Sequence, residues 1–250
     1  MLRDRRKASE YFDRWIEFDA VQMRETQVRL DSGAIFLPYG RVIAAYQQFD
    51  GILRRVIMRY SRGDDLADLR EDMVLLLAAR EQILKFCDAL PPEEQPARVI
   101  YERLSFDSYI DWFWWLSLAV CLGMERAHVH QVLGLIGNVG QDALIDRLAV
   151  QLGEERIVGG KLKFPAQYGS LLQALDACSQ EQQEKFVKTF LDGWYEGSSQ
   201  AAWYENHHGE DAGYFGYWCF EAALVVKLFG IDDASFCDNP YYPADLVRSH

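Results

Sequence analysis

The stretch GYFGYWCFEAALVVKLFGIDDASFCDNPYYPADL, residues 213–246, holds the most hydrophobic part of this 250-residue chain. Across residues 214–229, apolar side chains fall on every side of a helical wheel, which predicts a helix that is buried all round. Glu221 and Lys227 are the charged residues in this span. We expect the Glu221 carboxylate to share one helical face with three aromatic residues that precede it by seven, four and three positions, Tyr214, Tyr217 and Trp218.

Glu221 has two interpretations. A carboxyl group in apolar surroundings has a raised pKa, and such groups gather at active sites, so Glu221 is a candidate catalytic acid or base. Alternatively, hydrogen-bond donors hold the carboxylate and fix how the helix docks. We favour the structural interpretation, because no nucleophile or second acid stands at a defined spacing beside it.

Gly230 is a natural C-cap, and the tail that follows ends in NPYYPADL, residues 239–246. The two prolines and paired tyrosines predict an extended, stiff segment whose rings lie across the domain surface. The run GYWCFEAA at 216–223, the pair DD at 232–233 and the run YYPADL at 241–246 together resemble the C-terminal signature of the PoNi-type immunity proteins. Weaker support comes from Trp194, Trp203 and His207, and the N-terminal half, with Tyr11, Arg14 and Tyr46, is compatible with the family's N-terminal domain.

The resemblance implies an inhibitor that binds a DNase toxin of a bacterial type VI secretion system in the cytoplasm of the cell that makes both. We expect it to cover either the active site or the DNA-binding surface of that toxin. Exposed acids and rim tyrosines are the candidate contact groups, since tyrosine is enriched at binding hot spots: Glu205, Glu210, Asp211, Asp232, Asp233, Asp238, Tyr241 and Tyr242. A second set we assign to holding the fold: Trp194, Tyr217, Trp218, Glu221 and Pro243.

The distribution of charge favours a basic protein partner. The net charge is −12, and residues 191–250 hold ten acids against two bases. Such a negative field argues against direct nucleic-acid binding and attracts a positively charged partner. A DNase domain is such a partner, because it must present positive charge to phosphates. A solvated acidic surface without a special role is the alternative.

Composition predicts a folded protein that acts inside the cell. Half of the residues are hydrophobic, which excludes a disordered chain. The five cysteines are scattered and odd in number, a pattern typical of reduced thiols in cytosolic proteins. We see no signal peptide, and the longest uncharged apolar run, residues 112–124, is too short to span a membrane.

The periodicity predicts an all-α protein, a multi-helix bundle of antiparallel helices with an extended C-terminal tail. Apolar residues recur at helical spacing over these ranges: 9–29, 38–60, 64–90, 107–118, 125–136, 141–152, 165–178, 180–195 and 214–229. The proline-rich segment 91–96 is the best linker, so we predict an N-terminal helical bundle over 1–95 and a C-terminal helical domain over 96–250, with the two packed as one unit as the alternative. At 157–164 we predict either a small β hairpin or an ordered loop.

Catalytic and metal-binding signatures are weak. The run ENHHGED at 205–211 alternates imidazoles and carboxylates, but adjacent histidines diverge and no H-x-x-x-H spacing occurs, so we predict no metal, and we expect no cofactor. Two alternatives to the immunity function stay open: a helical hydrolase that uses Glu221 and His207, and a helical adaptor or homo-oligomer with an exposed aromatic cluster at Trp112, Trp114 and Trp115. The sequence does not decide which toxin is recognised or whether the free protein is a homodimer.

Overall fold

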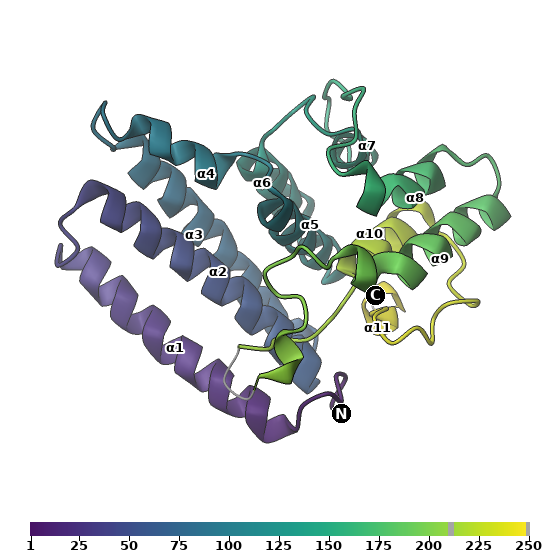
Figure 1. Cartoon of the computed structure of the whole chain (residues 1–250), viewed down its shortest axis with the longest axis horizontal. Coiled ribbons are helices and arrows are strands. Elements are labelled where there is room, and N and C mark those ends of the chain that lie inside the picture. The colour runs from purple at the N-terminus through teal and green to yellow at the C-terminus, as the bar shows by residue number, and fades with distance from the viewer. Residues whose placement is uncertain (210–212, 249–250) are drawn as a thin grey trace. The chain divides into compact units, whose positions relative to one another are not determined.

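The computed structural model describes residues 1–209 and 213–248 (Figure 1). Its regular elements are helices, and no strand occurs among these residues, so the all-α prediction is confirmed. The chain forms two compact units: unit 1 contains Met1–Arg103 and Glu205–Gly216, and unit 2 contains Leu104–Tyr204 and the chain from Tyr217 onward. The first division therefore falls between 103 and 104, where we predicted 95 and 96, and a later segment rejoins unit 1.

Unit 1 is built on three long antiparallel helices, α1 (Ser9–Asp31), α2 (Pro38–Arg62) and α3 (Arg70–Asp88). The third helix begins later than the predicted residue 64 or 65, because a short 3-10 turn, η1 (Ala67–Leu69), precedes it. The remaining elements of unit 1 are η2 (Gln95–Arg98), α4 (Val99–Glu102) and η3 (Asn206–His208).

Local sequence explains where α2 begins and ends. Pro38 occupies its first turn, where a missing N–H costs nothing. Gly63 ends the helix with φ 97°, a left-handed conformation that glycine adopts without a steric penalty. A Cβ at this position would lie 1.9 Å from the carbonyl oxygen of Met1, so a side chain here would also displace the N-terminal segment.

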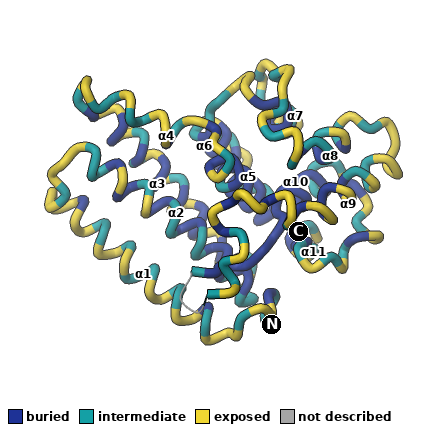
Figure 2. Tube along the Cα trace, in the orientation of Figure 1, coloured by how far each residue is buried: buried dark blue, intermediate teal, exposed yellow. Residues whose placement is uncertain are grey.

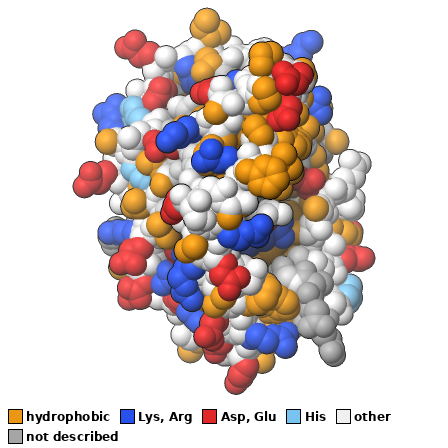
Figure 3. Space-filling view, turned by 90° about the vertical axis from the view of Figure 1, so that its left-hand side faces the viewer, with side chains coloured by type: hydrophobic (Ala, Val, Ile, Leu, Met, Phe, Trp, Pro, Cys, Tyr) orange, Lys and Arg blue, Asp and Glu red, His pale blue; other side chains and the backbone are white. Residues whose placement is uncertain are grey.

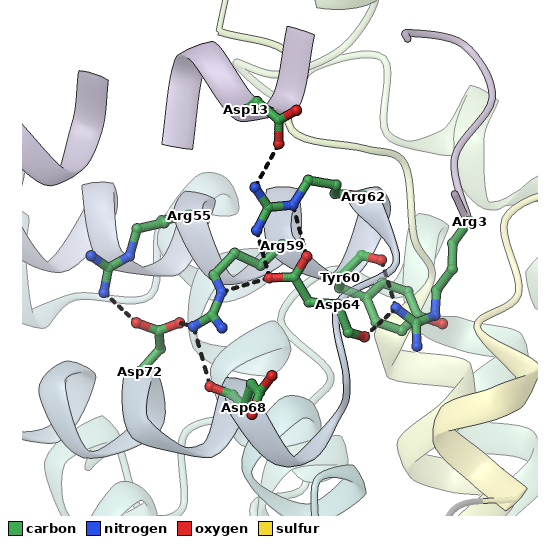
Figure 4. A network of polar contacts seen from close by, with 9 residues as sticks. All are labelled: Arg3, Asp13, Arg55, Arg59, Tyr60, Arg62, Asp64, Asp68 and Asp72. Atoms are coloured by element: carbon green, nitrogen blue, oxygen red, sulfur yellow. Dashed lines mark hydrogen bonds and ion pairs between the residues drawn. The ribbon is translucent and has the colours of Figure 1, made fainter. Parts of the chain in front are cut away.

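A network of ion pairs connects the helices of unit 1 (Figure 4). The buried carboxylate of Asp72 on α3 accepts hydrogen bonds from Arg55 and Arg59 on α2. Arg62 donates to Asp64 at 2.7 Å and to Asp13 on α1 at 2.7 Å. Removal of Asp72 would leave the charges of Arg55 and Arg59 uncompensated, so this part of the network holds α3 on α2.

Unit 2 contains the remaining helices: α5 (Phe106–Cys121), α6 (Arg126–Ile136), α7 (Ala143–Gln151), α8 (Pro165–Asp176), α9 (Gln180–Gly197), α10 (Phe220–Phe229) and α11 (Ala244–Arg248). Ser105 and Ser108 form a reciprocal capping box at the start of α5. Helix α10 packs against α5, α9 and α11, and Figure 2 shows both α5 and α10 buried. The core of unit 2 therefore forms around the two most hydrophobic helices of the sequence.

The helix predicted over 214–229 begins only at Phe220, so the expectation that Glu221 shares a helical face with Tyr214, Tyr217 and Trp218 is wrong. Gly216 has φ 114°, which no helix contains. Side chains of unit 1 also hold the backbone of this segment: Tyr11 accepts from the Tyr214 amide at 2.6 Å, and Ser61 donates to the Phe215 carbonyl at 2.8 Å. These contacts replace the hydrogen bonds of an earlier helical turn.

Of the two structures predicted at 157–164, a small hairpin and an ordered loop, the chain forms the loop. Two buried aspartates hold its backbone: Asp146 accepts from the Gly159 amide at 2.9 Å, and Asp142 accepts from the Lys163 amide at 2.7 Å. Gly159 also lies against Gly140, whose carbonyl oxygen would be 2.5 Å from an added Cβ. Side-chain acceptors therefore satisfy the amides that a hairpin would pair with a second strand.

Among the described helices none is both long and apolar enough to cross a membrane. All five cysteines are free thiols. Three of them are buried, Cys178 is exposed and Cys237 is half-buried.

Candidate partner-binding surface

The C-terminal tail of unit 2 runs alongside α9 (Figure 1). At the start of α9, Gln180 donates to the Gly230 carbonyl at 3.0 Å, and further along the side chain of Asn239 donates to Asp192 at 3.4 Å. Near the end of the helix, the ring of Tyr241 stacks on that of Tyr195. The tail and α9 therefore form one continuous surface, which we call the tail–α9 surface.

Three half-buried tyrosines form a row at one end of this surface. The ring centroids of Tyr204 and Tyr195 are 4.8 Å apart, and those of Tyr195 and Tyr241 are 5.2 Å apart with an interplanar angle of 6°. Below the row, the buried rings of Trp194 and Trp203 stack at 5.3 Å. We call Tyr204, Tyr195 and Tyr241 the tyrosine row, and its rigid floor means that little side-chain entropy is lost when a partner covers it.

Carboxylates lie beside the tyrosine row and along the tail. Glu196 is exposed and accepts from the Tyr204 hydroxyl at 3.1 Å, while Asp192 is exposed one helical turn earlier. Asp232 and Asp238 are exposed on the tail, which has no Lys or Arg between residues 231 and 243. By contrast, basic and acidic side chains are intermixed on the face of the molecule shown in Figure 3. An aromatic patch with an acidic rim suits a basic protein partner.

Glu221 lies beneath this surface, fully buried at the start of α10. Its Oε1 accepts from the Tyr168 hydroxyl at 3.2 Å and from Trp194 Nε1 at 3.5 Å. Burial raises the pKa of the Glu221 carboxyl to about 7, an effect that hydrogen bonds from Trp194 and Tyr168 partly offset. Because Trp194 forms the floor of the tyrosine row, the buried carboxyl orients the floor of the candidate surface.

The structure separates the residues that we predicted as contact groups. Asp232, Asp238 and Tyr241 lie on the tail–α9 surface. Glu205 is exposed but belongs to unit 1, and Glu210 and Asp211 lie outside the described residues.

Asp233 and Tyr242 do not lie at the surface in the way that we predicted for contact groups. Asp233 is half-buried and accepts from Arg248 at 3.0 Å. Tyr242, predicted as an exposed anchor, is only 4% exposed and packs edge-to-face on Phe236 at 5.2 Å. Both side chains therefore hold the tail in place. The residues predicted to hold the fold, Trp194, Tyr217, Trp218, Glu221 and Pro243, are all buried.

The residues that the structure describes offer no site for either alternative function. Glu221 is sealed among aromatic side chains of unit 2, whereas His207 belongs to unit 1, where its ring lies 6.3 Å from that of Tyr214. No group of three metal-binding side chains occurs in the described part of the chain. Trp112, Trp114 and Trp115 are at most 3% exposed, so the aromatic cluster that the adaptor hypothesis needs at the surface is core.

Sequence reasoning missed four residues of the surface: Tyr195, Tyr204, Asp192 and Glu196. The signal was present at the end of α9, where Asp192, Tyr195 and Glu196 flank Trp194 on neighbouring turns. What the sequence did not reveal is that the tail returns to this point and adds Tyr241 to the row.

Comparison with known proteins places the whole chain in one family. The N-terminal model of the PoNe immunity proteins (PoNi) matches residues 3–134, and the C-terminal model matches residues 140–246. A search of curated proteins found no match. The crystal structure of protein PA2201 from Pseudomonas aeruginosa superimposes with a TM-score of 0.65 at 18% identity, covering 99% of this chain and 97% of that one, and so shares the fold. Because two family models together span nearly every residue, this chain belongs to the PoNe immunity protein family, whose members are immunity proteins rather than enzymes.

Proposed function

We propose that this protein neutralises a cognate secreted DNase toxin, an effector of a type VI secretion system, by binding it in the cytoplasm of the producing cell. Membership of the immunity protein family across residues 3–134 and 140–246 carries this proposal. Neutralisation needs only stoichiometric binding, so a surface takes the place of catalytic residues.

The contact surface in this proposal is the tail–α9 surface. The exposed carboxylates of Glu196, Asp232 and Asp238 attract the basic groups with which a DNase holds phosphates. The tyrosine row then buries aromatic area against the toxin at one end of the contact. A surface that imitates the negative charge of DNA in this way blocks the DNA-binding face of the enzyme.

The experiment mixes this protein with the toxin domain encoded beside its gene, carrying an inactivating substitution so that the toxin can be purified. Light scattering on a sizing column should show a one-to-one complex, and labelled DNA should be released from the toxin as the complex forms. The association rate should fall as salt is raised, because screening weakens attraction between the charged surfaces.

Two results would contradict the proposal in different ways. Absence of any complex would mean that this toxin is not the partner. A complex that still binds DNA with unchanged affinity would refute blockage of the DNA-binding face while keeping the immunity function.

A further inference from the structure

Unit 1 has a groove along its three long helices. Helices α1 and α3 both pack on α2 but scarcely contact each other, so α2 forms the floor of a channel between them. The channel has a volume of about 470 Å³, with walls and floor that include Ala20, Arg24, Ile52, Arg55, Leu75 and Ala78. A fourth helix at this position would complete a bundle.

The groove extends to the end of the unit. A second hollow of about 420 Å³ shares Ala78 and Gln82 with the first and reaches Asp31 on α1 and Arg41 on α2. From Ala20 to Asp31 the wall is roughly 16 Å long at a rise of about 1.5 Å per residue. That length matches three turns of a docked helix.

The walls are poorly covered by the chain itself. In the 23-residue helix α1, only Phe12 and Leu30 are fully buried. On the opposite wall, Leu75 is 47% exposed. Apolar side chains left half-exposed in a continuous channel are typical of a surface that receives a partner.

Arginines at the groove specify the charge of that partner. Arg24 is exposed on the rim. Arg55 lines the first hollow from α2, where its guanidinium also binds Asp72, and the second hollow carries Arg41 and Lys85 beside Asp31 and Glu81. The lining therefore holds four basic side chains against two acidic ones, and guanidinium groups pair best with carboxylates, so the groove suits an apolar segment that carries acidic side chains.

We propose that this groove binds an acidic amphipathic helix of the cognate toxin, as a second contact beside the tail–α9 surface. The helix has apolar residues at spacings of three or four, which fill the channel over Ile52 and against Leu75. Its carboxylates pair with the exposed Arg24 on the rim. This inference rests on the proposed function, and it adds a contact that recognises an acidic part of the toxin rather than its DNA-binding face.

The test measures binding of full-length variants to the inactivated toxin domain by calorimetry. Ala78→Trp fills the groove from an exposed position on α3, and Gln22→Trp adds the same ring at an exposed position on α1 that lies outside the lining residues. Arg24→Glu reverses the charge on the rim, and Arg29→Glu makes the same change on α1 away from the groove. Because all four positions are exposed, thermal melts should show that the variants fold.

We expect Ala78→Trp and Arg24→Glu each to weaken binding by about tenfold or more, as hot-spot changes do, while both controls stay within about twofold. A photo-crosslinker at Gln27, which lines the groove, should label an acidic helix of the toxin.

Each other outcome overturns a defined part of the account. If the unaltered chain binds and the two groove variants bind equally well, the groove proposal is refuted and the proposed function stands. If the unaltered chain does not bind, both fail. If the free protein is a dimer that Ala78→Trp dissociates, the groove holds a second copy of this chain and not the toxin.

Discussion

Replacement of Glu221 by Gln should abolish a loss of stability that the unaltered protein undergoes as the pH rises. Burial raises the pKa of this carboxyl from the usual 4.5 to about 7 in the folded protein. Below pH 4.5 the group is protonated in both the folded and the unfolded chain. Between pH 4.5 and about pH 7 the carboxyl ionises only in the unfolded chain, which favours unfolding. Above the folded pKa the loss of folding stability has reached its full size. At about 1.4 kcal/mol per pH unit, the shift corresponds to roughly 3 kcal/mol.

Glutamine keeps the shape of Glu221 and stays neutral at every pH. We therefore expect the free energy of unfolding of Glu221→Gln, minus that of the unaltered protein, to move in favour of the variant by about 3 kcal/mol between pH 4.5 and pH 8. Urea unfolding followed by circular dichroism at five pH values measures this difference, from which the titration of all other groups cancels. Glu181→Gln, an exposed change on α9, is the control and should give a flat difference. A flat difference for Glu221→Gln as well would refute the inference that the buried carboxyl titrates near neutrality.

Further predictions concern the surface and the core. Asp232→Lys with Asp238→Lys should slow association with the toxin by about tenfold at low salt, because it reverses charge on the tail, and stopped-flow rates that do not change would contradict that role. Tyr241→Ala should weaken toxin binding by at least about tenfold in calorimetry with little loss of stability. Tyr242→Ala should instead lower the free energy of unfolding by about 3 kcal/mol, because it leaves a cavity; equal effects of the two changes on binding would count against this division. Asp72→Ala should lower the free energy of unfolding in urea by about 3 kcal/mol, because Arg55 and Arg59 lose their carboxylate partner. A loss of stability near zero would show that the network contributes nothing.

The helices of this protein can be predicted from sequence because each carries its own signals. Pro38 and Gly63 delimit α2, and Ser105 with Ser108 caps the aromatic helix α5. The start of α10 could not be predicted by periodicity, because residues 214–219 are as hydrophobic as the helix that follows. Gly213 and Gly216, both with positive φ, were the local evidence that the helix begins later.

The candidate surface was only partly predictable, because it depends on contacts between distant segments. The sequence indicated an acidic tail with tyrosines, and the structure leaves Asp232, Asp238 and Tyr241 accessible there. It did not indicate which tyrosine of the pair faces outward, since Tyr241 stacks on Tyr195 whereas Tyr242 packs on Phe236. The groove of unit 1 was also hidden, because it results from two helices packing on a third without closing on each other.

The most direct test of the account is a plasmid-cleavage titration in which the active toxin domain receives increasing amounts of this protein. The account predicts that cleavage stops at an equimolar amount, that this protein alone leaves the plasmid intact, and that Tyr241→Ala requires a larger amount. Undiminished cleavage at large excess, with no complex on a sizing column, would contradict the claim that this chain neutralises the toxin by binding it.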